Sequence, residues 1–260
     1  MMGIPDIIVL RQNLARRFVG QRISDFKIYW EKCVNVPSTS LIDVTVNSSL
    51  IEIRRVGQVL QFVLDHGFIL GIKVSQKAKF YLLGREATDS ILFEMKFSSG
   101  AGFGVDDGLG QTLLLLNPTL STASDVFHPS CTVSYLKKSV YLRRNDSIKA
   151  FLMRDPKIRG LGSTYLDEVL WVIQVAPHSL VGKIPESKFR ELIPTARQII
   201  CEAVERISSL TGPEELIADR RDFLNISNAG KKYDPNGFPI MKIVIHHRKT
   251  YWSDSQRIYQ

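Results

Sequence analysis

The stretch SIKAFLMRDPKIRGLGSTYLDEVLW, from Ser147 to Trp171, decides how this chain is organised. Its apolar spacing predicts one helix over residues 148–153 and a second helix that starts near Ser163 or Thr164. Thr164 and Asp167 have the spacing of a capping box at that start. Between the two patterns the helix is interrupted by a proline and two glycines: Pro156, Gly160 and Gly162. The sequence therefore predicts two helices joined by a flexible, glycine-containing turn.

The start of the second predicted helix is a candidate anion site. The first amides of a helix have no partner within it and carry the positive end of its dipole, and glycines let a phosphate approach the backbone. Four cations lie close upstream: Lys149, Arg154, Lys157 and Arg159. A turn between two packed helices with solvated basic side chains explains the same residues, so both interpretations stay open at this point.

The positive charge of the chain is concentrated in two short segments. The formal net charge is +8, yet residues 134–160 carry 8 Lys/Arg against 2 Asp/Glu and residues 221–260 carry 7 against 3. Basic runs are often only solvated faces, but this clustering favours a polyanion as the partner. No apolar run approaches the ~20 residues that span a bilayer, and the three cysteines are scattered, so a cytoplasmic protein with reduced cysteines is expected.

Hydrophobic periodicity divides the chain into three parts. Residues 1–132 begin with a helical pattern and continue with two-residue alternation, including a hairpin over residues 60–74, which predicts a β-sandwich with a leading helix. Residues 133–220 are helical, and Pro194 is expected to kink or end the long helix there. Residues 221–260 return to alternation after a Pro-Asn-Gly turn and predict a small hairpin. The expected fold class is multidomain α+β.

The central stretch resembles the helix–two-turn–helix of the formamidopyrimidine-DNA glycosylase / endonuclease VIII family. That family's pattern reads approximately IK-x-x-L-x-D-Q-x-x-I-x-G-I-G-N-x-Y-x-D-E-I-L. The matches run without a gap through Ile148, Lys149, Leu152, Ile158, Gly160, Gly162, Tyr165, Asp167, Glu168 and Leu170. RRVGQVLQF (54–62) and RKTYWSDSQ (248–256) are similar to two further motifs of the family, so the resemblance covers nearly the whole chain. It implies an N-terminal β-sandwich, a helix–two-turn–helix domain and a C-terminal hairpin finger.

The resemblance implies DNA contacts at named positions. In this family the helix–two-turn–helix and the finger clamp the phosphates of damaged DNA while the lesion is flipped out of the stack. Carried over position by position, the resemblance implies phosphate contacts from Lys149, from the amides around Gly162 and from Arg248. Ser163 stands where the family has asparagine, and a water molecule can bridge the distance that its shorter side chain leaves. Lys249 is a further cationic candidate.

The predicted finger differs from the common pattern of the family. No cysteine follows Cys201, and His246 and His247 are adjacent, so a four-ligand zinc site cannot be assembled there. The resemblance therefore implies a zincless finger, and no metal or cofactor is expected. Strand pairing and packing must hold the hairpin, with Tyr251 and Trp252 either in that packing or facing DNA.

The positions that carry the family's chemistry have changed. The family chain starts with Pro-Glu, where the proline amine attacks the sugar and the glutamate handles protons. These positions align with Met2 and Gly3, while Asp6 keeps a second acid that is one methylene shorter. The lysine of the family's R-R-x-G-K strand aligns with Gln58, which carries no charge.

Three further motif positions are candidate DNA contacts. The family's H-L-x-M-x-G stretch aligns with KVSQKA, which gives Lys73 in place of the histidine as a cation for phosphate. It also gives Gln76 in place of the methionine that fills the hole left by a flipped base. Phe103-Gly104 is similar to the Phe-Gly of a loop that faces the opposite strand, although the family's arginine is missing.

The changed residues predict loss of chemistry with retention of binding. The leading hypothesis is a monomeric DNA-binding protein of glycosylase ancestry that recognises damaged or abasic duplex DNA, with base excision impaired or lost. The alternative is an active DNA glycosylase/AP lyase that uses an atypical amine. That amine is either Lys73 or the Gly3 nitrogen after removal of Met2, one residue from the proline position and without an acid next to it. A third hypothesis is a scaffold that no longer binds DNA.

Overall fold

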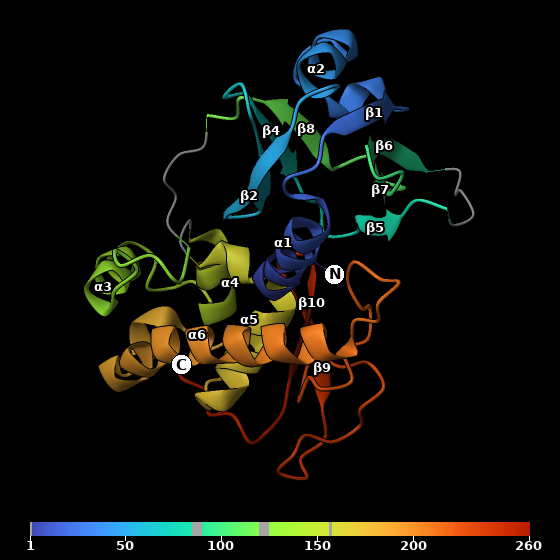
Figure 1. Cartoon of the computed structure of the whole chain (residues 1–260). Helices are drawn as coiled ribbons and strands as arrows, with labels where there is room; N and C mark the ends of the chain where they lie inside the picture. The colour runs from blue at the N-terminus through green and yellow to red at the C-terminus, as the bar shows by residue number, and fades with distance from the viewer. Residues whose placement is uncertain (1, 85–89, 120–124, 156–157) are drawn as a thin grey trace. The chain divides into compact units, whose positions relative to one another are not determined.

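The chain forms two compact units (Figure 1). The computed structural model describes residues 2–84, 90–119, 125–155 and 158–260. The first unit comprises residues 1–122 and 207–219, and the second comprises residues 123–206 and 220–260. The sequence predicted three parts, whereas the contacts group the C-terminal hairpin with the helices and the end of the long helix with the sandwich.

Two four-stranded antiparallel sheets form the first unit, with strand orders β1-β6-β7-β5 and β2-β3-β4-β8. The helical elements are α1 (Ile4–Phe18), α2 (Ser38–Thr45) and the 3-10 turn η1 (Glu31–Cys33). The strands are β1 (Ile23–Ile28), β2 (Leu50–Val56), β3 (Val59–Leu64), β4 (Ile69–Lys73), β5 (Lys79–Leu82), β6 (Ile91–Phe97), β7 (Gly102–Asp106) and β8 (Leu113–Leu116).

The core of the first unit lies between its two sheets. Phe103 of β7 stacks on Phe62 of β3 with 5.8 Å between the ring centroids, so the inward faces of the sheets pack against each other. The predicted apolar face of α1 is buried in the same core through Ile7, Leu10, Leu14 and Phe18. The predicted hairpin is present as β3 and β4, with Phe62 opposite Leu70. The expected β-sandwich with a leading helix is therefore confirmed.

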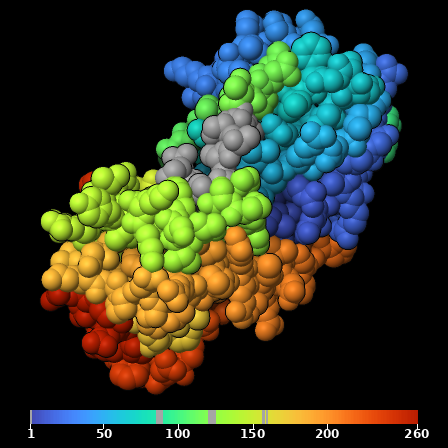
Figure 2. Space-filling view, turned by 90° about the vertical axis from the view of Figure 1, so that its left-hand side faces the viewer, coloured from blue at the N-terminus to red at the C-terminus, as the bar shows by residue number. Residues whose placement is uncertain are grey.

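The second unit is helical and ends in a two-stranded hairpin. Its helices are α3 (Val133–Leu142), α4 (Ile148–Arg154), α5 (Ser163–Val172) and α6 (Glu186–Leu210), with the 3-10 turns η2 (Arg159–Leu161) and η3 (Val181–Lys183). The hairpin strands are β9 (Met241–Ile245) and β10 (Arg248–Trp252). Figure 2 shows the yellow-green segment with α3 on the surface of this unit. No helix in the described ranges is long and apolar enough to cross a membrane.

The long helix α6 continues through Pro194, although a kink or boundary was predicted there. Proline removes one backbone donor from the helix, which leaves the carbonyl four residues earlier without its helical partner. That carbonyl belongs to Arg190, whose side chain is exposed, so water can reach this face. On the opposite face, Ile193, Ala196 and Ile200 are buried. We attribute the uninterrupted helix to this packing, which offsets the missing bond.

Candidate nucleic-acid interface

The turn between α4 and α5 presents the start of a helix without a side-chain cap. Gly162 is the N-cap residue of α5 and adopts a φ of 86°, a left-handed conformation that favours glycine, and it has no side chain to accept a bond from the first amides. The predicted capping box between Thr164 and Asp167 is therefore wrong, because Gly162 rather than Thr164 is the N-cap residue and Asp167 has other partners. The amides of the first turn remain the donors that the sequence predicted for an anion.

Strand β10 lies against this helix start. The carbonyl oxygen of Lys249 is 3.5 Å from the hydroxyl of Ser163, the first residue of α5. The backbone amide of Tyr251 donates to a carboxylate oxygen of Asp167 at 3.1 Å. These contacts hold the exposed side chains of Arg248 and Lys249 next to the N-terminus of α5. The second unit thus combines helix amides and cationic side chains in one place.

A buried ion pair fixes this arrangement. The Lys149 ammonium of α4 donates to Asp167 at 2.6 Å, and both side chains are fully enclosed, at 0% and 1% exposure. The same ammonium is 3.5 Å from the Lys249 carbonyl oxygen. Burial raises the pKa of Asp167 to about 7, although the Lys149 charge and the Tyr251 amide favour the carboxylate. Burial likewise lowers the pKa of Lys149, against the effect of Asp167.

The burial of Lys149 corrects its expected role. A phosphate cannot reach an ammonium with no exposed surface, and Asp167 and Lys249 already surround it. The lysine instead ties α4 to α5 and β10. Only the fold shows that this charge points inward, because the partner carboxylate is 18 residues away in the sequence.

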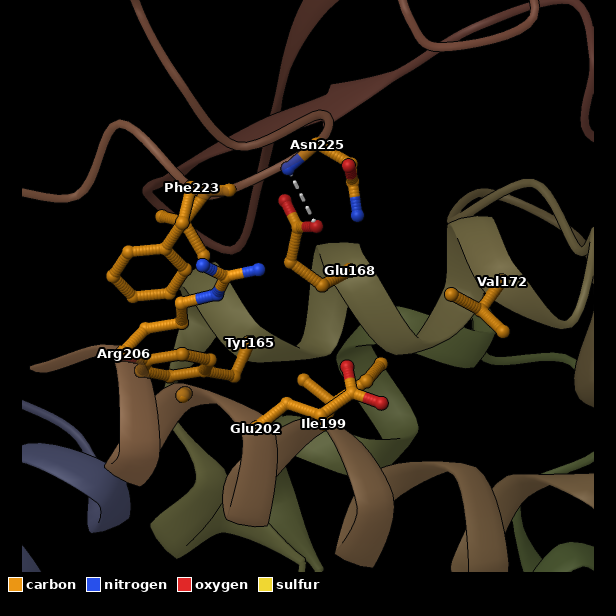
Figure 3. A pocket seen from close by; sticks show the side chains of 10 residues that line it. Tyr165, Glu168, Val172, Ile199, Glu202, Arg206, Phe223 and Asn225 are labelled. Atoms are coloured by element: carbon orange, nitrogen blue, oxygen red, sulfur yellow. Dashed lines mark hydrogen bonds between the residues drawn. The ribbon is translucent and has the colours of Figure 1, made fainter. Parts of the chain in front are cut away.

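The neighbouring carboxylate Glu168 organises a second loop. It accepts the backbone amides of Asn225, Ile226 and Ser227 at 2.8–2.9 Å and is almost fully buried. Figure 3 shows its carboxylate turned toward Asn225. A carboxylate that accepts three amides replaces their hydration and fixes the path of the loop. Asp167 and Glu168 thus fasten two different parts of the C-terminal segment to α5.

A pocket of about 430 Å³ lies between α5, α6 and this loop. In Figure 3 the Arg206 side chain lies beside the rings of Tyr165 and Phe223, and Glu168 lies on the wall formed by α5. Val172, Ile199, Glu202, Ala203, Leu224 and Asn225 complete the lining. No residue of this pocket was selected from the sequence as a site, because its walls come from three segments that the periodicity treats separately.

Asp234 is the polar centre at the base of the hairpin. One of its oxygens accepts Trp171 Nε1 and the hydroxyls of Ser253 and Ser255, and the other accepts the amides of Asn236 and Phe238. Burial alone would raise the pKa of Asp234, but these bonds outweigh it and lower the pKa to about 2. In the described part of the chain, no group of three or more His, Cys, Asp or Glu side chains is placed to hold a metal ion.

In the first unit, the changed positions of the family's chemistry lie at the start of α1. The Met2 amide donates to the carbonyl oxygen of Gln76 at 3.1 Å, so these two predicted site residues are neighbours. The Gly3 amide donates to the fully buried carboxylate of Asp6 at 2.7 Å. An acid therefore lies next to the Gly3 nitrogen, which corrects the expectation that none would be there.

Gln58 and Lys73 lie at the adjoining ends of β3 and β4. The Gln58 carbonyl oxygen accepts the Val74 amide at 3.1 Å, and the Lys73 side chain is exposed at the end of β4. The exposed ammonium of Lys73 can meet an anion from solvent.

Phe103 is a core residue rather than a DNA contact. The sequence placed it on a loop, whereas it lies within β7 with no exposed surface. Its ring contacts five other phenylalanine rings: Phe18, Phe62, Phe80, Phe93 and Phe97. The two-residue match to the family motif gave no information on burial, whereas the alternation along the strand could have predicted an inward position.

The fold and sequence are similar to those of known proteins. A model of the formamidopyrimidine-DNA glycosylase H2TH domain, the helix–two-turn–helix domain, matches residues 122–212. The formamidopyrimidine-DNA glycosylase of Symbiobacterium thermophilum is 25% identical over 269 residues, which cover 97% of this chain and 88% of that protein. The enzyme of the same name from Mycoplasma pneumoniae is 23% identical over 273 residues, with 96% and 97% covered.

Solved structures share the whole fold. The crystal structure of Lactococcus lactis Fpg in complex with DNA that contains an abasic site superposes with a TM-score of 0.85. It is 22% identical and covers 98% of this chain and 100% of its own. A structure of MutM in complex with DNA that contains carbocyclic 8-oxo-G gives the same TM-score at 20% identity.

Proposed function

Because the chain belongs to the formamidopyrimidine-DNA glycosylase / endonuclease VIII family, we propose that it binds damaged or abasic duplex DNA without excising a base. The observation that carries this proposal is the contact between β10 and the start of α5. It sets the exposed Arg248 and Lys249 beside the first amides of α5, and both features attract phosphate. The Lactococcus lactis proteins of the same fold were solved with abasic or lesion-containing DNA.

The first unit supports the second half of the proposal. At the positions of the family's proline, glutamate and lysine stand Met2, Gly3 and Gln58, none of which has an ionisable side chain. Schiff-base chemistry needs an amine with its nitrogen lone pair available, and proton transfer needs an acid or base of suitable pKa. Asp6 is the acid that remains, and its carboxylate accepts the Gly3 amide. Binding without base excision is the function that fits these residues.

One contact favours a second candidate function, an AP lyase with an atypical amine. If processing exposes the nitrogen of Gly3, the Asp6 carboxylate lies 2.7 Å from it and can accept its proton. Lys73 is the other candidate amine, since it is exposed at the end of β4. An attack by either amine on the sugar C1′ of an abasic site would form an imine and release water.

Two measurements test both functions on the full chain. The first is binding to intact and abasic-analogue duplexes at several salt concentrations; we expect tighter binding to the abasic duplex and a steep loss of affinity with salt. Binding that does not depend on salt would contradict the proposed phosphate interface.

The second measurement is borohydride trapping on an abasic oligonucleotide. We expect no covalent adduct with the wild-type protein. An adduct that disappears in Lys73→Met, or after a change at Gly3, would establish the lyase instead, and Lys77→Met provides a control at another exposed lysine.

A further inference from the structure

The tip of the β9–β10 hairpin has an unusual backbone. Ile245 pairs with Arg248, so His246 and His247 alone form the turn. Both have positive φ, at 47° and 58°, and both side chains are exposed. Two-residue hairpin turns of this kind favour Asn-Gly or Gly-Gly, because residues with a β-carbon are strained in the left-handed region. Two adjacent histidines at these positions therefore call for an explanation beyond turn formation.

A contact from α4 orients the first histidine. Arg154 Nη2 lies 3.2 Å from His246 Nδ1, while its Nη1 pairs with Asp146 at 3.3 Å. A guanidinium only donates, so Nδ1 of His246 must accept. The neutral imidazole then carries its proton on Nε2, which makes that atom a hydrogen-bond donor.

The tip is close in sequence to a strand residue that contacts the helix start. Lys249, whose carbonyl oxygen lies 3.5 Å from Ser163 Oγ, follows His247 by two residues along β10. Strand residues advance ~3.3 Å each, so the backbone of His247 lies within roughly 7 Å of that of Lys249. The tip is thus two residues along the chain from the strand position that contacts the start of α5, and its neighbours include the cations Arg154, Arg248 and Lys249.

We propose that His246 and His247 bind DNA phosphates beside the position served by the N-terminus of α5, with Arg154 as the positioning residue for His246. This inference rests on the proposed function and names new contact residues for it. Imidazole N–H groups in a cationic environment suit phosphate oxygens, and an Asn-Gly turn would lack both imidazoles.

The test is the variant His246→Asn/His247→Gly, which keeps the turn and removes both imidazoles. Relief of the strained backbone should raise the Tm by roughly 2–4 °C. Affinity for a duplex with an abasic analogue should fall about tenfold, the equivalent of one lost hydrogen bond to a charged group. A purely structural role for the histidines predicts the same rise in Tm, but with an affinity for the duplex that is unchanged or higher. His128→Asn removes an exposed imidazole elsewhere in the second unit and should change neither quantity.

A double-mutant cycle examines the orienting contact. Arg154→Lys keeps the charge but loses the fork that joins Asp146 to His246. It should weaken binding in the wild-type background and have a smaller effect once the imidazoles are gone. Equal effects in both backgrounds would overturn the role given to Arg154.

The possible outcomes separate this inference from the function on which it rests. If the wild-type protein binds abasic DNA and the turn variant binds equally well, the histidine contacts are excluded and the proposed function stands. If the wild-type protein shows no salt-dependent DNA binding, the proposed function fails and this inference fails with it. A loss confined to some flanking sequences would show base contacts and overturn the assignment to phosphate.

Discussion

The two units preserve their family-like features by different means. At the start of the first unit, backbone hydrogen bonds join Met2 to Gln76 and Val74 to Gln58, and they form whatever side chains stand there. In the second unit, the buried side chains of Asp167, Glu168 and Asp234 hold the hairpin region. Met2 and Gln58 are therefore joined to their neighbours independently of their side chains, whereas the proposed binding surface of the second unit depends on specific carboxylates.

The largest expected effect on stability comes from Asp167→Asn, which removes one of the carboxylates that hold the second unit. The change leaves the buried Lys149 ammonium without its charge partner, and removal of one member of a buried pair destabilises by about 3–5 kcal/mol. Chemical denaturation of the full chain measures this loss. Asp222→Asn, an exposed position in the same unit, should have almost no effect.

A paired replacement sharpens that result. Lys149→Met combined with Asp167→Leu removes both charges, and such replacements are often neutral or stabilising. We expect the double variant to be clearly more stable than Asp167→Asn. Equal destabilisation by both variants would show that the amide bond to Tyr251, rather than the ion pair, carries the stability.

Acid should destabilise the base of the hairpin, because it protonates the Asp234 carboxylate. Its folded pKa of about 2 lies below the ordinary value of 3.8, so its stabilisation is present above pH ~4 and is lost as the pH falls toward 2. The difference corresponds to roughly 2 kcal/mol. Unfolding followed by Trp171 fluorescence between pH 5 and 2 measures it, since the indole donates to this carboxylate. In Asp234→Asn this part of the pH dependence should disappear, whereas Asp254→Asn should retain it.

Loss of hairpin charge should weaken DNA binding without affecting stability. Arg248→Ala/Lys249→Ala should lower the slope of log affinity against log salt by about two, since each lost phosphate contact removes about one unit. The measurement is a binding titration at several salt concentrations. Arg190→Ala, an exposed arginine of α6, provides the control. An unchanged slope in the double variant would remove the hairpin from the interface.

The smallest expected effect belongs to Lys73→Gln in the first unit. One phosphate contact at the end of β4 predicts a slope lower by about one unit and little change in stability, because the side chain is exposed. If this variant lowers affinity more than the double hairpin variant, the first unit rather than the second contributes most of the electrostatic binding.

Much of the fold could be predicted from local patterns. The apolar stripe of α1, the alternation of β3 and β4 and the glycine-containing turn before α5 each report a backbone preference that survives in the structure. The site was harder to predict, because a motif identifies a position without its burial. Lys149 and Phe103 were both selected as DNA contacts, and both are enclosed.

The sequence by itself determined the resemblance to the family, the order of the elements and the absence of ionisable side chains at Met2, Gly3 and Gln58, because these depend on residue identity and local periodicity. The tertiary structure alone decided that Asp167 neutralises Lys149, that Asp6 lies beside the Gly3 nitrogen and that Arg154 contacts His246. Two of these three contacts join residues 18 and 92 positions apart, and the third depends on a buried helix start. Charge pairing inside a protein follows distance and burial in space, which spacing along the chain does not report.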